Sequence, residues 1–416
     1  MNEKIQIIFG LLGGLAVFIY GMNMMSECLQ KAAGDKMKSI LALLTKNPLL
    51  GVLAGALTTA VLQSSSATTV MAIGFVSAGL MNLPQAISII FGANIGTTMT
   101  AQIIAFKISD YIYVIIFIGF LISFVTKSEK VKSIGQTIFA FGLLFLGIET
   151  MGDVMKPLAS SPVFTDLIGR VAHIPVLGVA VGTVMTLVVQ SSSATIAVLQ
   201  NFASQPGPDG VTSILGLAGA IPILLGDNIG TTITALLASI GQSKDAKRTA
   251  IAHSFFNITG TCVFIWIIPW FAQFVRYISP KGNEIDVISR QIANAHTTFN
   301  VFCTLVWLPL IPLMVKIVTT IIRGRDKNTG VVYEPKYLDN KVIDQPVAAM
   351  YLVSQELENL TGFAVHMLNS LKGSLNQKKT SAAYEKFKNQ LDIVQHLQEE
   401  ITDYITKLFS SGNLTE

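Results

Sequence analysis

The sequence predicts an all-α polytopic membrane protein with two inverted structural repeats, each carrying a re-entrant helical hairpin, and a small helical cytoplasmic tail. The composition is 51% hydrophobic and 13% charged, with a mean hydropathy of +0.57. Soluble domains carry about 25% charged residues, so most of this chain is expected inside a lipid bilayer. Residues 1–322 hold 31 charged residues, whereas the much shorter 323–416 holds 23. This contrast separates a membrane body from a soluble tail.

Charge and cysteine content exclude other classes of protein. The net charge of +4 is spread over loops, so no nucleic-acid partner is expected. Cys28, Cys262 and Cys303 are isolated from one another in the sequence, which indicates neither a disulfide framework nor a metal site. No cofactor is expected, and whether the chain forms a homo-oligomer stays open.

The elements of the membrane body follow from a pass along the apolar segments. Two stretches, 48–80 and 175–205, are each too long for one crossing and short for two. Both have a polar centre, so each is predicted to be a hairpin whose tip lies within the membrane against protein or a water-filled cavity. The predicted crossings are 5–25, 85–106, 111–126, 134–155, 213–239, 249–275 and 293–322.

The membrane body contains an internal duplication. "NPLLGVLAGALTTAVLQSSSATT" (47–69) aligns without gaps on "IPVLGVAVGTVMTLVVQSSSATI" (174–196). Further along, "FGANIGTTMTA" (91–101) aligns on "LGDNIGTTITA" (225–235). Two motifs therefore recur in the same order in both halves of the body.

Topology follows from the number of crossings in each repeat. Three crossings are an odd number, so the second copy is expected upside down relative to the first. Basic residues divide thirteen to seven between the two sides, and the positive-inside rule makes the richer side cytoplasmic. We expect a multi-pass protein of the cell (inner) membrane with the N-terminus outside and the tail in the cytoplasm. Inverted repeats with broken helices at the midplane indicate a secondary transporter.

The hairpin tips offer an uncharged site for an anion. No Lys or Arg lies near either QSSSAT motif, and a buried cation there would be costly. Hydroxyls, Gln amides and the free N–H groups of a helix start can bind an anion instead, and Ser is a favoured N-cap. Two helix starts supply roughly one positive charge, so the rest of a divalent anion's charge predicts coupling to Na⁺ or H⁺.

The second motif offers oxygen ligands for a cation. Its paired glycines are expected to permit unwinding, which would free oxygens near the break. Asp227 replaces Ala93 of the first copy and is expected to serve the cation, because an intramembrane carboxylate is functional by default. In the first copy the candidate sodium ligands are Asn94, Thr97 and Thr98.

The pair of motifs, present twice, resembles the type II sodium-dependent phosphate cotransporter family in its bacterial branch. The resemblance covers about residues 1–320 and implies symport of inorganic phosphate with Na⁺, for which we expect alternating access. Asp227 departs from the small residue expected there, which leaves Na⁺ or H⁺ coupling open. The resemblance assigns phosphate to Gln63, Ser64, Ser65, Ser66, Gln190, Ser191, Ser192 and Ser193, and sodium to Asp227, Asn228, Thr231 and Thr234.

The tail resembles part of a PhoU-type helical domain. "YLDNKVIDQPVAAMYLVSQELENLTGFAVHMLNSL" (337–371) carries an apolar stripe at helical spacing, and a second helix is expected at 381–408. Two helices are fewer than a full bundle of this type needs. The predicted organisation is a transport domain at 1–322 (repeats at about 5–126 and 134–275, final crossing 293–322), a linker at 323–336 and the tail at 337–416.

Other functions remain open as alternatives. Coupling to protons through Asp227, or transport of another oxyanion, would use the same site. A membrane phosphate sensor is a third alternative. An intramembrane hydrolase is disfavoured, because the serines lack a Gly-flanked nucleophile setting. His253 with Asn257, and His296 with Asn300, are spaced i,i+4 and are expected to hydrogen-bond between helices.

Overall fold

The computed structural model describes residues 3–33, 47–106, 108–159, 174–207, 209–324, 335–375 and 380–410. Within these residues the secondary structure is helical, apart from one isolated bridge between Pro206 and Ser213. Four described helices are long and apolar enough to cross a membrane, and two further helix pairs meet the same criterion together. The predicted all-helical membrane architecture is therefore confirmed.

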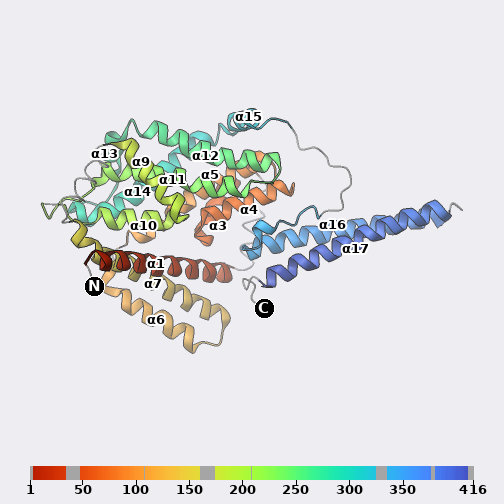
Figure 1. The fold of residues 1–416 in the computed structure, drawn as a ribbon, viewed down its shortest axis with the longest axis horizontal. Coiled ribbons are helices and arrows are strands. Elements are labelled where there is room, and N and C mark those ends of the chain that lie inside the picture. The colour runs from red at the N-terminus through yellow and green to blue at the C-terminus, as the bar shows by residue number, and fades with distance from the viewer. Residues whose placement is uncertain are drawn as a thin grey trace.

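Three helices, α1 (Glu3–Ala33), α6 (Ile112–Val125) and α7 (Glu129–Ala159), lie side by side along one edge of the body (Figure 1). Glycines allow α1 and α7 to approach closely. A Cβ on Gly14 would meet Gly147 O at 2.9 Å, and one on Gly147 would meet Gly14 O at 2.6 Å. Small residues at such contacts are typical of membrane helix packing. Helix α6 covers the predicted crossing 111–126 but has only 14 residues, about 21 Å at 1.5 Å per residue.

Both predicted hairpins consist of two helices separated by a short break. The first comprises α3 (Pro48–Leu62) and α4 (Ser65–Ser77), and the second comprises α9 (Pro175–Val189) and α10 (Ser192–Ala203). Each break falls at the QSSS motif. The helix that follows each hairpin, α5 (Leu83–Ile104) or α11 (Gly216–Ala238), packs against the first arm of its own hairpin. The duplication in the sequence is thus a duplication of structure.

Two predicted crossings are bent rather than straight. The segment 249–275 forms α12 (Lys244–Phe264) and α13 (Ile268–Ile278), which meet at 95°. The segment 293–322 forms α14 (Glu284–Trp307) and α15 (Ile311–Ile321), which meet at 85°. Pro269 and Pro312 stand in the first turn of the second helix of each pair, where a proline cannot continue the preceding helix. Each of these predicted crossings is therefore a bent pair of helices, and together the two helices of a pair are long and apolar enough for one span.

The tail forms a helical pair that extends away from the body (Figure 1). A short turn, η2 (Asn340–Val342), precedes α16 (Pro346–Leu375) and α17 (Thr380–Ser410), close to the predicted ranges. Ala349 and Val353 of α16 pack against Ile401 and Leu408 of α17. Most of the predicted linker, residues 325–334, and the last six residues lie outside the described part of the chain.

The start of the tail contacts the membrane body. Val342 is fully buried and lies over Gly74 of α4, where a Cβ would be only 2.9 Å from the valine. The Lys341 ammonium donates to Ala238 O at 2.7 Å and to Ile240 O at the end of α11. A cation at the C-terminus of a helix is favourable because it meets unpaired carbonyls there. Tyr404 of α17 donates to Asp339 O at 2.8 Å, and burial raises the pKa of its hydroxyl, so it keeps that proton.

The inverted orientation of the repeats, the sidedness of the termini and the domain boundaries stay predictions. What the structure adds is contact between the two parts that the sequence separates. The first residues of the tail contact α4 and α11, two helices that carry predicted site residues.

Candidate solute-binding site

The two hairpin breaks have the same backbone geometry. Gln63 ends α3 with φ 51° and ψ 25°, and Gln190 ends α9 with φ 53° and ψ 26°. They are the two non-glycine residues with positive φ in the described part of the chain. A left-handed conformation costs about 1–2 kcal/mol for a residue with a Cβ. Strained residues of this kind cluster at functional sites, which directs attention to these tips.

Each break is followed by a capped helix start. Ser64 accepts from Ala67 N and Ser191 accepts from Ala194 N, both at 3.2 Å, so the predicted N-caps are confirmed. The amides of the first turn have no partner within their own helix, because no carbonyl precedes them. Ser65 and Ser66 in α4, and Ser192 and Ser193 in α10, occupy that first turn. Both tips therefore present N–H donors at the positive end of a helix.

A threonine pair ties the two arms of each hairpin together beside the break. Thr59 donates to Thr68 at 2.8 Å, and Thr186 lies 3.1 Å from Thr195 in the second copy. Every one of these threonines is buried. The equivalence of the two pairs shows that both hairpins fold by the same local rules.

The first tip reaches a helix of the other repeat. The hydroxyl of Thr234 of α11 lies 3.1 Å from the hydroxyl of Ser66, within hydrogen-bond distance. Thr100 of α5, the equivalent of Thr234 in the first repeat, donates to Gln63 Oε1 at 3.1 Å. A predicted phosphate residue and a predicted sodium residue, distant in sequence, are thus brought together.

The second tip is less enclosed than the first. Gln190 is exposed, whereas Gln63 is half-buried. The hydrogen bonds described for Ser191 stay within its own hairpin. No described hydrogen bond joins the two serine triplets, so their close approach stays a prediction.

Asp227 lies against the second hairpin. Its carboxylate is fully buried, and Oδ1 accepts a hydrogen bond of 2.6 Å from Thr186, which contacts Thr195 in turn. Oδ2 has no hydrogen-bond partner among the described residues. A buried carboxylate oxygen without a donor suits a cation or a proton. Ala93 at the equivalent place leaves the first hairpin without this group.

The GxNIGTT motifs do not unwind, and the expectation that they would is wrong. Helices α5 and α11 run without interruption through both copies. Their glycines serve close packing instead, since a Cβ on Gly92 would meet Val52 O at 2.0 Å and one on Gly226 would meet Val179 O at 2.1 Å. The threonines bond to their own helix: Thr97 to Ala93 O, Thr98 to Ile95 O and Thr231 to Asp227 O.

Both motif asparagines are paired with a histidine of a neighbouring helix. His253 Nε2 of α12 lies 3.3 Å from Asn94 Oδ1, and His296 Nε2 of α14 lies 3.0 Å from Asn228 Oδ1. All four side chains are buried. The prediction that the histidines hydrogen-bond between helices is confirmed. In this arrangement the asparagine oxygens already accept a hydrogen bond, and their role as sodium ligands stays a prediction.

The contacts of the site with the tail could not be read from the sequence. Residues 339–342 carry no motif, and their position depends on packing between segments far apart in the chain.

In the described residues no group of three or more His, Cys, Asp or Glu could hold a metal ion. A cation at this site would therefore rely on hydroxyl, carbonyl and amide oxygens with Asp227, a set that suits a hard cation such as Na⁺ and not a soft transition metal.

Comparison with known proteins identifies a family that matches the chain twice. The sequence profile of the Na+/Pi-cotransporter family matches residues 17–153 and again 148–279, one match for each repeat. Uncharacterized protein YqeW of Bacillus subtilis (strain 168) is 35% identical over 263 residues, which is 63% of this chain and 83% of that protein. No solved structure matches the chain.

Two further relatives have names that describe phosphate movement. "Putative inorganic phosphate export protein YjbB" of Escherichia coli (strain K12) is 24% identical over 365 residues, covering 87% of this chain and 64% of that protein. "Sodium-dependent phosphate transport protein 2A" of Rattus norvegicus is 39% identical over 99 residues, 23% of this chain and 15% of that protein. The chain thus spans less than two thirds of the length of the export protein.

Proposed function

Because this chain belongs to the Na+/Pi-cotransporter family, we propose that it is a secondary transporter that moves inorganic phosphate across the cell membrane in symport with Na⁺. The hydrogen bond between Ser66 and Thr234 carries the proposal, because it joins a hairpin tip to the helix that contains the second GxNIGTT motif. The relative named for sodium-dependent phosphate transport supports the same substrates.

Phosphate would be held by neutral groups. The first-turn amides and hydroxyls at Ser64–Ser66 and Ser191–Ser193, with the amides of Gln63 and Gln190, supply donors without a buried cation. An oxyanion with up to two negative charges fits two helix starts that together supply about one positive charge. The uncompensated charge explains why a cation would travel with it.

Sodium would bind around α11. The buried carboxylate of Asp227, with its unpartnered Oδ2, is the strongest ligand there. Oxygens of Asn228, Thr231 and Thr234, and of Asn94, Thr97 and Thr98 in the first repeat, complete the candidate set. Transport would proceed by alternating access, with the two repeats exchanging which tip is open; the more exposed second tip supports such an asymmetry.

Transport into proteoliposomes tests the proposal. The purified chain should accumulate labelled phosphate only when a Na⁺ gradient is imposed in the same direction, and arsenate should compete better than sulfate. Phosphate uptake that does not depend on Na⁺ would contradict sodium coupling but would still identify phosphate as the substrate.

Proton coupling is the second candidate, and Asp227 favours it. A buried carboxyl with one donor and one unpartnered oxygen can hold a proton in place of a cation. The relative named for phosphate export makes the net direction a separate question. Uptake measured against a pH gradient without Na⁺ distinguishes proton from sodium coupling, and loading phosphate on either side of the membrane gives the direction.

A further inference from the structure

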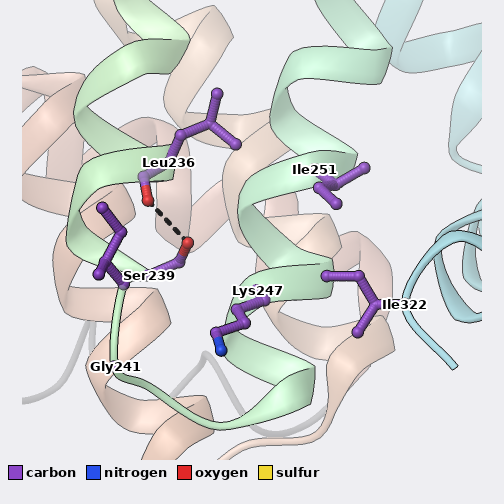
Figure 2. Close-up of a pocket in the computed structure, with 7 residues that line it drawn as sticks. Leu236, Ser239, Gly241, Lys247, Ile251 and Ile322 are labelled. Carbon is purple, nitrogen blue, oxygen red and sulfur yellow. Dashed lines mark hydrogen bonds between the residues drawn. The ribbon is translucent and has the colours of Figure 1, made fainter. Parts of the chain in front are cut away.

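A groove of about 310 Å³ lies outside the site, at the end of α11 and the start of α12 (Figure 2). Its volume is at the lower limit of small-molecule pockets, which measure about 300–1,000 Å³. The walls are mostly aliphatic, and Lys247 is the charged side chain among them. The lining residues are Leu236, Ser239, Ile240, Gly241, Lys247, Ile251 and Ile322.

Lys247 is the charged residue that lines the groove, and its ammonium can bind an anion. The hydroxyl of Ser239 donates to Leu236 O at 2.8 Å within its own helix, as the dashed line in Figure 2 marks. Lys247 points toward the loop that follows α11 (Figure 2), and no described hydrogen bond or ion pair engages its ammonium. A ligand of this groove would therefore combine an apolar body with a negative group.

The surroundings of the groove match the edge of a bilayer. Leu237 and Ile240 are 50% and 65% exposed beside it, an apolar surface suited to lipid. Basic residues gather at the same end: Arg323 is exposed, and Arg248 donates to Ile322 O and Gly324 O while it pairs with Asp245 at 2.6 Å. Apolar walls below a basic rim are complementary to a lipid with an anionic headgroup.

The contact between α5 and α14 is the counterpart of this groove, and there protein side chains engage the cation. The 134-residue offset of the GxNIGTT helices relates Leu236 to Gln102 and Ile240 to Phe106. The 43-residue offset between HSFFN and HTTFN relates Lys247 to Arg290 and Ile251 to Asn294. Compared with the contact between α5 and α14, the groove has aliphatic side chains in place of Gln102 and Asn294, and it also has a cation.

At the equivalent place the cation has protein partners. Arg290 donates to Gln102 Oε1 at 2.6 Å, and Gln102 Nε2 donates to Asn294 Oδ1 at 3.1 Å. The guanidinium lies 4.6 Å from the ring centre of Phe106. Leu236 and Ile251 cannot give Lys247 such hydrogen bonds, so the amine is left for an external anion.

We propose that this groove binds an anionic phospholipid, with an acyl chain against Leu236, Ile240 and Ile251 and the headgroup phosphate at Lys247. Free inorganic phosphate does not suit the groove, because the aliphatic walls would remove water from a charged ion without replacing its hydrogen bonds. The site is separate from the hairpin tips and does not depend on the function proposed for them.

Native mass spectrometry of the full chain in detergent tests the proposal with phosphatidylglycerol and phosphatidylcholine of identical acyl chains. Wild-type protein should prefer phosphatidylglycerol. Lys247→Gln should weaken phosphatidylglycerol binding about fivefold, the factor that corresponds to about 1 kcal/mol for one lysine at an anionic surface, and abolish the preference. Lys247→Arg should retain it.

A second variant tests the apolar walls. Leu236→Gln with Ile251→Asn recreates the polar lining of the contact between α5 and α14 and should lower binding of both lipids. Lys281→Gln, on an exposed loop, should change neither. Equal binding of the two lipids by wild type, or an unchanged preference in Lys247→Gln, would overturn the proposal. So would displacement of phosphatidylglycerol by inorganic phosphate, which would identify the groove as an oxyanion site.

Discussion

The hydroxyl of Thr234 lies 3.1 Å from the hydroxyl of Ser66, although the two residues are 168 positions apart and belong to different repeats. Thr234 also bonds to Thr231 O of its own helix, so its side chain orientation is fixed by α11. The contact places the N-terminal turn of α4 against the helix that carries Asp227. Binding of a solute at Ser66 in one repeat would therefore affect the position of α11 in the other repeat.

Removal of either hydroxyl should weaken phosphate binding. Ser66→Ala deletes a proposed phosphate donor, and Thr234→Val, at a proposed sodium ligand, deletes the hydroxyl that contacts Ser66. A hydrogen bond to a charged ligand contributes about 1.5–3 kcal/mol. We expect a ten- to hundredfold rise in the dissociation constant for phosphate, measured by titration at fixed Na⁺. The double variant should lose less than the sum, because both changes break one contact. Thr150→Val is the matched control, because the described hydrogen bond of its hydroxyl stays within its own helix, to Leu146 O. Full additivity would contradict coupling between the two residues.

Replacement of Gln63 should separate backbone strain from ligand binding. Gln63→Gly removes the penalty of the left-handed conformation, so its unfolding free energy should exceed that of Gln63→Ala by about 1 kcal/mol. Both variants lose the amide and should bind phosphate about ten- to hundredfold more weakly. Thermal unfolding and phosphate titration measure the two effects separately. At Thr150, within a regular helix, the order of Gly and Ala should reverse. The same order at both positions would rule out strain at the tip.

Asp227 should control the coupling ion. Asp227→Asn preserves an acceptor for Thr186 but removes the negative charge, and Asp227→Ala reproduces the first repeat. We expect both variants to lose the dependence of phosphate binding on Na⁺ concentration, and the Ala variant also to lose stability because Thr186 loses its partner. Asp110→Asn, at an exposed turn, serves as the control. Unchanged responses to both Na⁺ and pH in Asp227→Asn would show that the carboxylate has only a structural role.

The two histidines should differ in their contribution to stability. His296→Ala leaves Asn228 Oδ1 without its described donor, whereas after His253→Ala the amide of Asn257 still donates to Asn94 at 3.4 Å. An unsatisfied buried acceptor costs about 1–3 kcal/mol, so His296→Ala should unfold at the lower temperature. Thermal unfolding in detergent checks the order. Phosphate transport should survive in folded variants, and its complete loss in both would instead argue for a direct chemical role.

The anchor of the tail should affect the phosphate site from a distance. Val342→Asp introduces a charge against Gly74 at a fully buried position and should release the tail from α4 and α11. We expect a weaker apparent affinity for phosphate with the membrane body still folded, because α4 and α11 lose a shared contact. Leu357→Asp, on an exposed part of α16, should have no effect. Equal behaviour of the two variants in phosphate titrations would show that the tail is energetically independent of the site.

Local rules explain what the sequence predicted well. The hairpins, their breaks at Gln63 and Gln190 and their serine caps depend on residues within a few positions of one another. The tail helices follow from apolar spacing for the same reason. The bends at Pro269 and Pro312 also had a local signal, which hydropathy alone obscures because the flanking residues are apolar on both sides.

Long-range packing explains what the sequence did not predict. The glycines of GxNIGTT suggested unwinding, but Gly92 and Gly226 are required by the close approach of α3 and α9. The partners of Ser66, Asn94 and Lys341 belong to segments far away in the chain, so no local pattern identifies them.

The packing of Val342 over Gly74 ties the evolution of two distant parts of the chain. Even an alanine at position 74 would press on the valine, so the residue at this point of α4 can enlarge only if the tail changes or is lost. A homologous body without such a tail would be free of this restriction. The size of the side chain at position 74 thus indicates whether a helical tail packs against the first hairpin.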